Sequence, residues 1–89
     1  MPYVGPPRAG ENADVDTTAE QLTATSTLVS YVAIQADPDN TGDVFVGDSA
    51  GQYVQLTPGQ SIGLAVTNLD TIYVRGSANN QAVNYLAID

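Results

Sequence analysis

Residues 43–74, DVFVGDSAGQYVQLTPGQSIGLAVTNLDTIYV, decide the fold of this chain. The stretch holds four short apolar alternations, at residues 44–46, 53–56, 62–66 and 72–74, and Gly, Pro, Asp or Asn separates each from the next. Alternation with a period of two places every second side chain on the same face of a strand. We therefore predict antiparallel strands that close over one core.

Two connections within this stretch carry turn chemistry. Residues 47–51, Gly-Asp-Ser-Ala-Gly, supply glycines for positive φ angles. The sequence Thr57-Pro58-Gly59-Gln60 places Pro at the second and Gly at the third position of a type II turn. Both connections are therefore expected to reverse the chain tightly.

The composition is that of one small domain whose surface is poor in charge. The chain has 89 residues, 43% hydrophobic and 13% charged, whereas about a quarter of a typical globular chain is charged. A domain this short buries a smaller fraction of its surface than a larger one does. A surface of Thr, Ser, Asn, Gln and Gly is typical of a protein packed against others in an assembly, and secreted β domains share it.

The formal net charge is -8, and the cations are Arg8 and Arg75. Non-specific binding to phosphate backbones is supplied by Lys and Arg, so nucleic acid and anionic membrane surfaces are not expected as partners. An acidic, lysine-free chain is also typical of salt-loving hosts. There are no cysteines, so no disulfide framework is expected. We see no signal peptide or membrane-spanning apolar run, and expect a protein made in a host cytoplasm.

Residues 1–19 contain three of the five prolines and an acidic, polar run. Pro removes a ladder donor and favours extended backbone, so we predict an extended N-terminal arm followed by a β domain at residues 20–89. One interpretation is a disordered tail. The other is a capsid-binding arm that becomes ordered on a neighbouring subunit, with Tyr3, Val4 and Arg8 as its contacts.

Three further segments complete the predicted strands. A short strand is possible at residues 21–25, residues 28–36 are apolar on both phases, as in a central strand covered on two sides, and residues 81–88 form the last strand. No helix is predicted. The fold class is therefore an all-β, antiparallel sandwich or jelly-roll-like domain of about six to eight short strands. The predicted core is Val32, Ile34, Val44, Val46, Leu56, Ile62, Leu64, Val66, Leu69, Ile72, Val74 and Leu86.

The alternation leaves Tyr31, Phe45 and Tyr73 on the opposite phase from this core. If their strands share a sheet, its outer face carries aromatic side chains, and an outer face of that kind usually marks contact with another molecule. The alternative is that a loop or the arm covers them within the monomer. Tyr53 has the same outward phase, and the phase of Tyr85 is ambiguous.

Asp37, Asp39, Thr41, Gly42 and Asp48 approximate a calcium-binding loop. The match is incomplete, because Asp stands where a bidentate Glu is usual and the flanking segments are predicted strands. A turn in which Asp and Asn side chains cap their own backbone explains the same residues. We therefore predict no metal and no cofactor.

The chain contains no His, Cys or Lys, which removes nucleophilic triads, thiol chemistry and Schiff bases. Carboxylate pairs such as Asp37 with Asp39, or Asp43 with Asp48, lie in predicted turns open to solvent. We predict a protein that is not an enzyme. A carbohydrate-binding or adhesion module that uses the tyrosines as a stacking surface remains an alternative.

Four segments resemble small β-rich structural proteins encoded among the virion genes of tailed bacteriophages. They are IQADPDNTGDVFVG at 34–47, LTPGQSI at 56–62, LDTIYVRGSA at 69–78 and VNYLA at 83–87. The family pairs an ADxxNTGxVYVG strand and turn with LxPGESI, LxxIYV and VxYLA segments. The resemblance covers residues 28–88 and excludes the predicted arm. It implies a capsid decoration or cement protein on the surface of the head, or otherwise a fibre, spike or tail-associated domain, and it supplies no catalytic residues.

A small, weakly charged domain with outward aromatics is expected to associate with itself and with the major capsid protein or another virion protein. Closed cyclic symmetry is the usual form of such assemblies, and we predict a trimer. Its interface is predicted to use Tyr31, Phe45, Tyr73 and Tyr85, because large aromatics supply much of the energy of an interface. Arg75 is expected either to pair with a neighbour's carboxylate or to remain in solvent.

Overall fold

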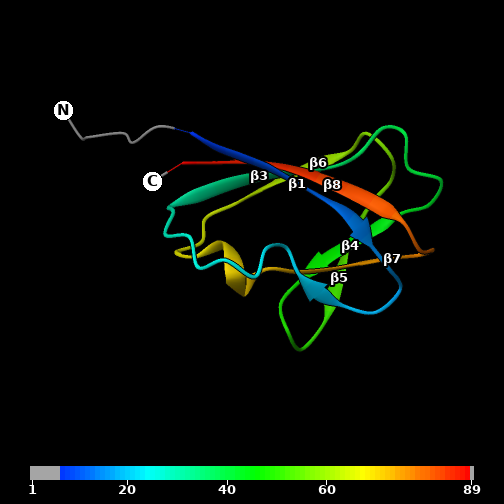
Figure 1. The fold of residues 1–89 in the computed structure, drawn as a ribbon, viewed down its shortest axis with the longest axis horizontal. Coiled ribbons are helices and arrows are strands. Elements are labelled where there is room, and N and C mark those ends of the chain that lie inside the picture. Colours follow the sequence, from blue (N-terminus) through cyan, green and yellow to red (C-terminus); the bar gives the residue numbers. More distant parts are fainter. Residues whose placement is uncertain (1–6, 89) are drawn as a thin grey trace.

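The computed structural model describes residues 7–88, which form two four-stranded antiparallel sheets packed face to face (Figure 1). The first sheet has the strand order β1-β8-β3-β6 and the second has the order β2-β7-β4-β5. The predicted all-β sandwich is confirmed. The strands are β1 Arg8–Val15, β2 Glu20–Gln21, β3 Tyr31–Ala36, β4 Val44–Gly47, β5 Gln52–Leu56, β6 Ser61–Leu64, β7 Tyr73–Gly76 and β8 Gln81–Ile88. A 3-10 turn, η1, spans Leu69–Thr71.

The four apolar alternations that predicted the fold correspond, in chain order, to strands β4, β5, β6 and β7. The turn between β5 and β6 has the predicted chemistry. Gly59 has φ 88°, and the backbone N–H of Gln60 donates to the carbonyl of Thr57 at 2.9 Å. Since a side chain at that φ is strained, Gly59 fixes how β5 reverses into β6.

The core lies between the sheets and contains most of the predicted residues. Ile62, Leu64 and Val66 are half-buried and pack against it. The loops at one end of the sandwich add Leu22 and Val29, which the sequence pattern did not indicate. The predicted core residues found buried are Val32, Ile34, Val44, Val46, Leu56, Leu69, Ile72 and Val74.

The prediction that Leu86 belongs to the core is wrong, because 51% of its surface is exposed. On β8 the residues opposite Val32 and Ile34 are Ala87 and Tyr85, so these two face inward. Leu86 lies between them and therefore points to the outer face. Tyr85 packs against the core in a half-buried position.

The predicted boundary of the arm at residue 19 is also wrong. Residues 8–15 form β1, which pairs with β8, and Val15 is fully buried. Strand β1 lies at the edge of the first sheet and is held chiefly by backbone hydrogen bonds to β8. Its residues are therefore mostly polar, and the hydrophobic pattern does not predict a strand there. The backbone of Gly10 lies close to the ring of Tyr85, and a Cβ at this position would collide with that ring. The proposed contacts Tyr3 and Val4 lie outside the described residues, whereas Arg8 begins β1.

Strand β3 differs from its prediction on one face. It is central, between β8 and β6, and its inward residues Val32, Ile34 and Ala36 are buried. Its other face carries Tyr31 and Ala33, which are exposed. The sequence of β3 is apolar on both faces and predicts a strand covered on both sides, whereas residues 7–88 cover only the inward face.

A buried glutamine joins the two sheets at the end where β4 and β8 begin. Gln81 is fully buried, and its Oε1 accepts the backbone N–H of Gly42 at 2.9 Å. Its Nε2 donates to the hydroxyl of Thr41 at 3.1 Å and to the carbonyl of Asn79 at 2.9 Å. The side chain therefore connects β8 to the loop that leads into β4.

We expect Gln81→Leu to lower the free energy of unfolding by about 1–3 kcal/mol, because it leaves the N–H of Gly42 without its partner. Urea denaturation followed by circular dichroism measures the change. Gln60→Leu, in an exposed turn where Oε1 accepts from the Thr57 N–H, is the matched control with a smaller expected loss. Equal losses for the two variants would contradict a structural role for Gln81.

Candidate interaction surfaces

The aromatic residues predicted as one interface are divided between opposite faces of the sandwich. Tyr31 is on the outer face of the first sheet, whereas Phe45 and Tyr73 belong to adjacent strands of the second sheet. Tyr85 faces the core. These residues therefore do not form one surface, because the strands that carry them belong to different layers.

Phe45 already has a partner within the monomer. The guanidinium of Arg75 lies 4.2 Å from the centre of the Phe45 ring, and its Nη2 donates to the carbonyl of Gln52 at 3.2 Å. A cation over an aromatic face at the surface contributes roughly 0.5–1 kcal/mol. Arg75 therefore ties β7 to β4 and β5. Its pairing with a neighbour's carboxylate stays a prediction.

The outer face of the first sheet carries an apolar surface, which we call the outer patch and define as Tyr31, Ala33, Leu86 and Ile88. The register places Tyr31 opposite Ile88 and Ala33 opposite Leu86, so all four side chains share one face. The exposed fractions of Tyr31, Leu86 and Ile88 are 45%, 51% and 36%. Because none of the four is charged, the outer patch is an apolar surface on an acidic chain.

A shallow hollow of about 210 Å³ lies beside the outer patch, lined in part by Ala33, Leu86 and Ser61. The hydroxyl of Tyr31 lies over Gly63 of β6, where a Cβ would collide with it. Gly63 therefore allows the ring to lie flat along the sheet. Leu86 and Ile88 were missed as surface residues because residues 83–88 are apolar on both phases except at Asn84.

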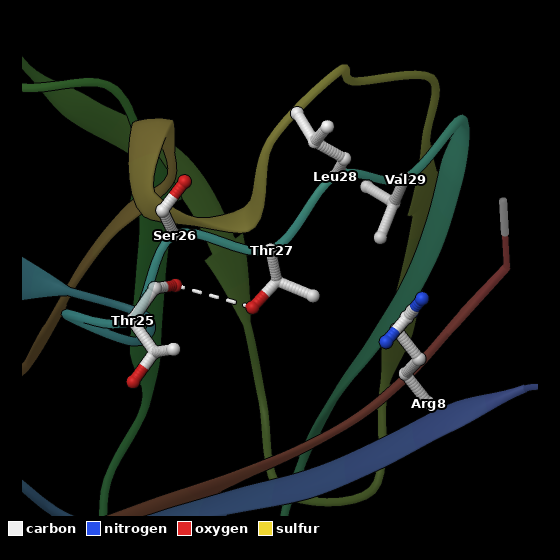
Figure 2. Close-up of a pocket in the computed structure, with 6 residues that line it drawn as sticks. All are labelled: Arg8, Thr25, Ser26, Thr27, Leu28 and Val29. Atoms are coloured by element: carbon white, nitrogen blue, oxygen red, sulfur yellow. Dashed lines mark hydrogen bonds between the residues drawn. The ribbon is translucent and has the colours of Figure 1, made fainter.

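A second hollow, of about 630 Å³ and open to solvent, lies between the start of β1 and residues 25–29 (Figure 2). Arg8 extends from β1 toward this segment, and the hydroxyl of Thr27 donates to the carbonyl of Thr25 at 3.2 Å. Leu28 is 72% exposed. Among residues 7–88 no tyrosine lines this hollow, so its described lining does not include the stacking residues expected of a carbohydrate-binding module. The lining residues are Arg8, Thr25, Ser26, Thr27, Leu28 and Val29.

Asn68 holds this segment in place. Its Oδ1 accepts the backbone N–H of Thr27 at 2.9 Å and that of Asp70 at 3.1 Å. Its Nδ2 donates to the hydroxyl of Ser26 at 2.8 Å. One side chain thus caps η1 and fixes the loop across it, which defines one wall of the second hollow.

The carboxylates of the calcium-like pattern serve their own turns. Asp37 Oδ1 accepts the backbone N–H of Asp39 at 2.9 Å, and Asp48 Oδ1 accepts those of Ala50 and Gly51 at 2.9 and 3.1 Å. Across residues 7–88, no group of three or more acidic side chains is placed to hold a metal ion. The structure thus matches the turn interpretation of these residues.

Comparison with known proteins finds no family model, no curated protein and no solved structure that matches this chain. Within the described part of the chain, no helix is long and apolar enough to cross a membrane. The outer patch and the second hollow are therefore interpreted from their geometry alone.

Proposed function

We propose that this chain is a non-enzymatic virion structural protein that decorates the outer surface of a bacteriophage head and stabilises it. In this proposal it is made in the host cytoplasm and contacts the major capsid protein or another virion protein. The motifs at residues 34–47, 56–62, 69–78 and 83–87 supply the virion setting, because they resemble those of phage structural proteins.

The observation that carries the proposal is that the outer face of β3 is apolar and exposed to solvent. The strand is apolar on both phases, but the described chain covers the face of Val32 and Ile34 and leaves Tyr31 and Ala33 exposed. Together with Leu86 and Ile88 of β8, this face forms the outer patch. Exposed apolar surfaces of this kind mark interaction sites, so we assign attachment to the outer patch.

The first test is the protein's presence and copy number in purified particles. A copy number comparable with that of the major capsid protein supports decoration. A few copies per particle would instead place the protein at a spike or tail, and its absence from particles would overturn a virion role.

The second test places a charge on the outer patch. We expect Leu86→Glu to weaken binding to particles that lack the protein by about tenfold or more, because burying an unpaired carboxylate costs several kcal/mol. Ser49→Glu, in the exposed turn between β4 and β5, adds the same charge elsewhere and should bind normally. Co-sedimentation measures binding, and circular dichroism checks the fold. Equal binding by the two variants would exclude the outer patch as the attachment surface.

A further inference from the structure

The sandwich is open along one side, between β5 and β6, which are the edge strands of the two sheets. A groove of about 400 Å³ lies there. We call it the side groove and define it by Val54 of β5, Ile62 and Leu64 of β6, and Asp48, which follows β4. Ile62 and Leu64 are paired with buried residues of β3 and share their inward phase. The side groove therefore lies on the core side of the first sheet, and the outer patch lies on its other face.

The aliphatic side chains of the side groove are only partly covered by the rest of the chain. Val54 is 44% exposed, and Ile62 and Leu64 are half-buried. All three have the phase of core residues. A second molecule that covers them supplies the apolar burial that the monomer leaves incomplete.

Among the described residues, Asp48 is the one charged side chain that lines the side groove. Its Oδ1 accepts the backbone N–H groups of Ala50 and Gly51 at 2.9 and 3.1 Å, which fixes the carboxylate on the turn between β4 and β5. Within residues 7–88 its Oδ2 accepts no hydrogen bond, and neither arginine lines the groove. This oxygen is therefore available to a donor on a second molecule.

Tyr53 lies beside the same carboxylate. Asp48 and Tyr53 both line a third hollow, of about 320 Å³, which shares four lining residues with the side groove. The register between β4 and β5 is irregular at Tyr53, and such bulges turn a side chain away from its regular direction. The side chain is 85% exposed. A ligand that reaches Asp48 therefore has an open aromatic ring next to it.

The charge of this region selects the kind of molecule that the side groove accepts. A formal net charge of -8 attracts basic molecules and repels acidic ones, including a second copy of this chain. A carboxylate and the face of an aromatic ring both favour a cation. Among cationic side chains arginine suits both, because its planar guanidinium stacks on a ring and donates N–H groups from its edge.

We propose that the side groove binds a protein segment in which an arginine follows a short aliphatic run. The aliphatic side chains of that segment cover Val54, Ile62 and Leu64. The guanidinium donates to Oδ2 of Asp48 and stacks on the ring of Tyr53. This binding is independent of the virion role and of the outer patch, because it uses the opposite face of the first sheet.

Nuclear magnetic resonance titration of the unmodified chain with synthetic peptides tests the proposal. The probe is acetyl-Leu-Val-Leu-Arg-amide, and its matched control has citrulline in place of arginine, which keeps the shape and removes the charge. We expect saturable shifts of the methyl signals of Val54, Ile62 and Leu64. The arginine peptide should bind about three- to tenfold more tightly than the citrulline peptide. Equal affinities, or the absence of saturable shifts, would refute the proposal.

Asp48→Asn tests the carboxylate. The variant loses the charge, but its side-chain oxygen can still accept the two backbone N–H groups of the turn. We expect it to bind both peptides with the affinity of the citrulline peptide. Asp39→Asn, in the exposed loop before β4, makes the same change in net charge and should retain the preference for arginine. An equal loss of preference in both variants would mean that net charge attracts the peptide and that Asp48 does not bind it.

Val54→Thr tests the aliphatic contact, because it replaces a methyl group with a hydroxyl of similar size at a partly exposed position. It should weaken both peptides by about threefold and keep the preference for arginine. Thermal denaturation followed by circular dichroism checks that each variant is folded. Unchanged affinity of both peptides for the folded variant would place their binding outside the side groove and contradict the proposal.

Discussion

Deletion of residues 1–19 is expected to unfold the domain. The deletion removes β1, which pairs with β8 along the register from Arg8 opposite Ala87 to Val15 opposite Gln81. It also removes the buried side chain of Val15 and the carbonyl of Asp16, which accepts the backbone N–H of Gly76 at 2.8 Å. The loss of an edge strand exceeds what a domain with about 5–15 kcal/mol of stability can absorb.

Thermal denaturation followed by circular dichroism measures this effect. The chain that begins at residue 20 should show no cooperative transition at 25 °C or above. A chain that begins at residue 7 keeps the whole of β1 and is the control for shortening the N-terminus. A cooperative transition in the shorter chain would show that β1 belongs to an arm, as the sequence predicts. Loss of particle binding after the same deletion therefore does not locate the attachment surface.

Ile34→Ala is expected to lower the free energy of unfolding by about 2–5 kcal/mol. Ile34 is fully buried on the central strand β3, and the substitution leaves a cavity between the sheets. The loss is large because β8 and β6 hold β3 on both sides, so the backbone cannot collapse into the cavity. Urea denaturation measures the difference.

Leu86→Ala is the matched control, because it removes a large aliphatic side chain from the adjacent strand on the opposite face of the sheet. Leu86 is 51% exposed, so its truncation should cost clearly less than that of Ile34. The sequence pattern assigned both residues to the core. Equal losses for the two variants would mean that β8 has the opposite phase and that the outer patch does not include Leu86.

The sequence was sufficient for strands that alternate cleanly and end in turn residues. Strands β4 and β7 were predicted because Val44 and Val46, and Ile72 and Val74, keep one phase between polar breaks. The turn at Gly59 was predicted because its positive φ favours glycine. In these segments local preference and tertiary packing agree, so a single sequence is enough.

Edges and doubly apolar strands were harder to predict. Strand β1 is held by backbone pairing with β8, which leaves little hydrophobic pattern to find. Strand β8 is apolar on both phases, so its register is set by β3 and not by its own sequence. For the same reason the outer patch was only partly predicted: Tyr31 was identified as outward-facing, but Leu86 was placed inside.

The pairing of β1 with β8 also governs how the molecule is produced. The first described strand finds its neighbour in the last, so the first sheet cannot be completed on the ribosome until β8 has emerged. A topology dominated by contacts between distant segments folds slowly, on the order of milliseconds to seconds. During that interval β3 and β5 are exposed as apolar segments able to aggregate. The net charge of -8 keeps nascent chains apart while they wait for their final strand.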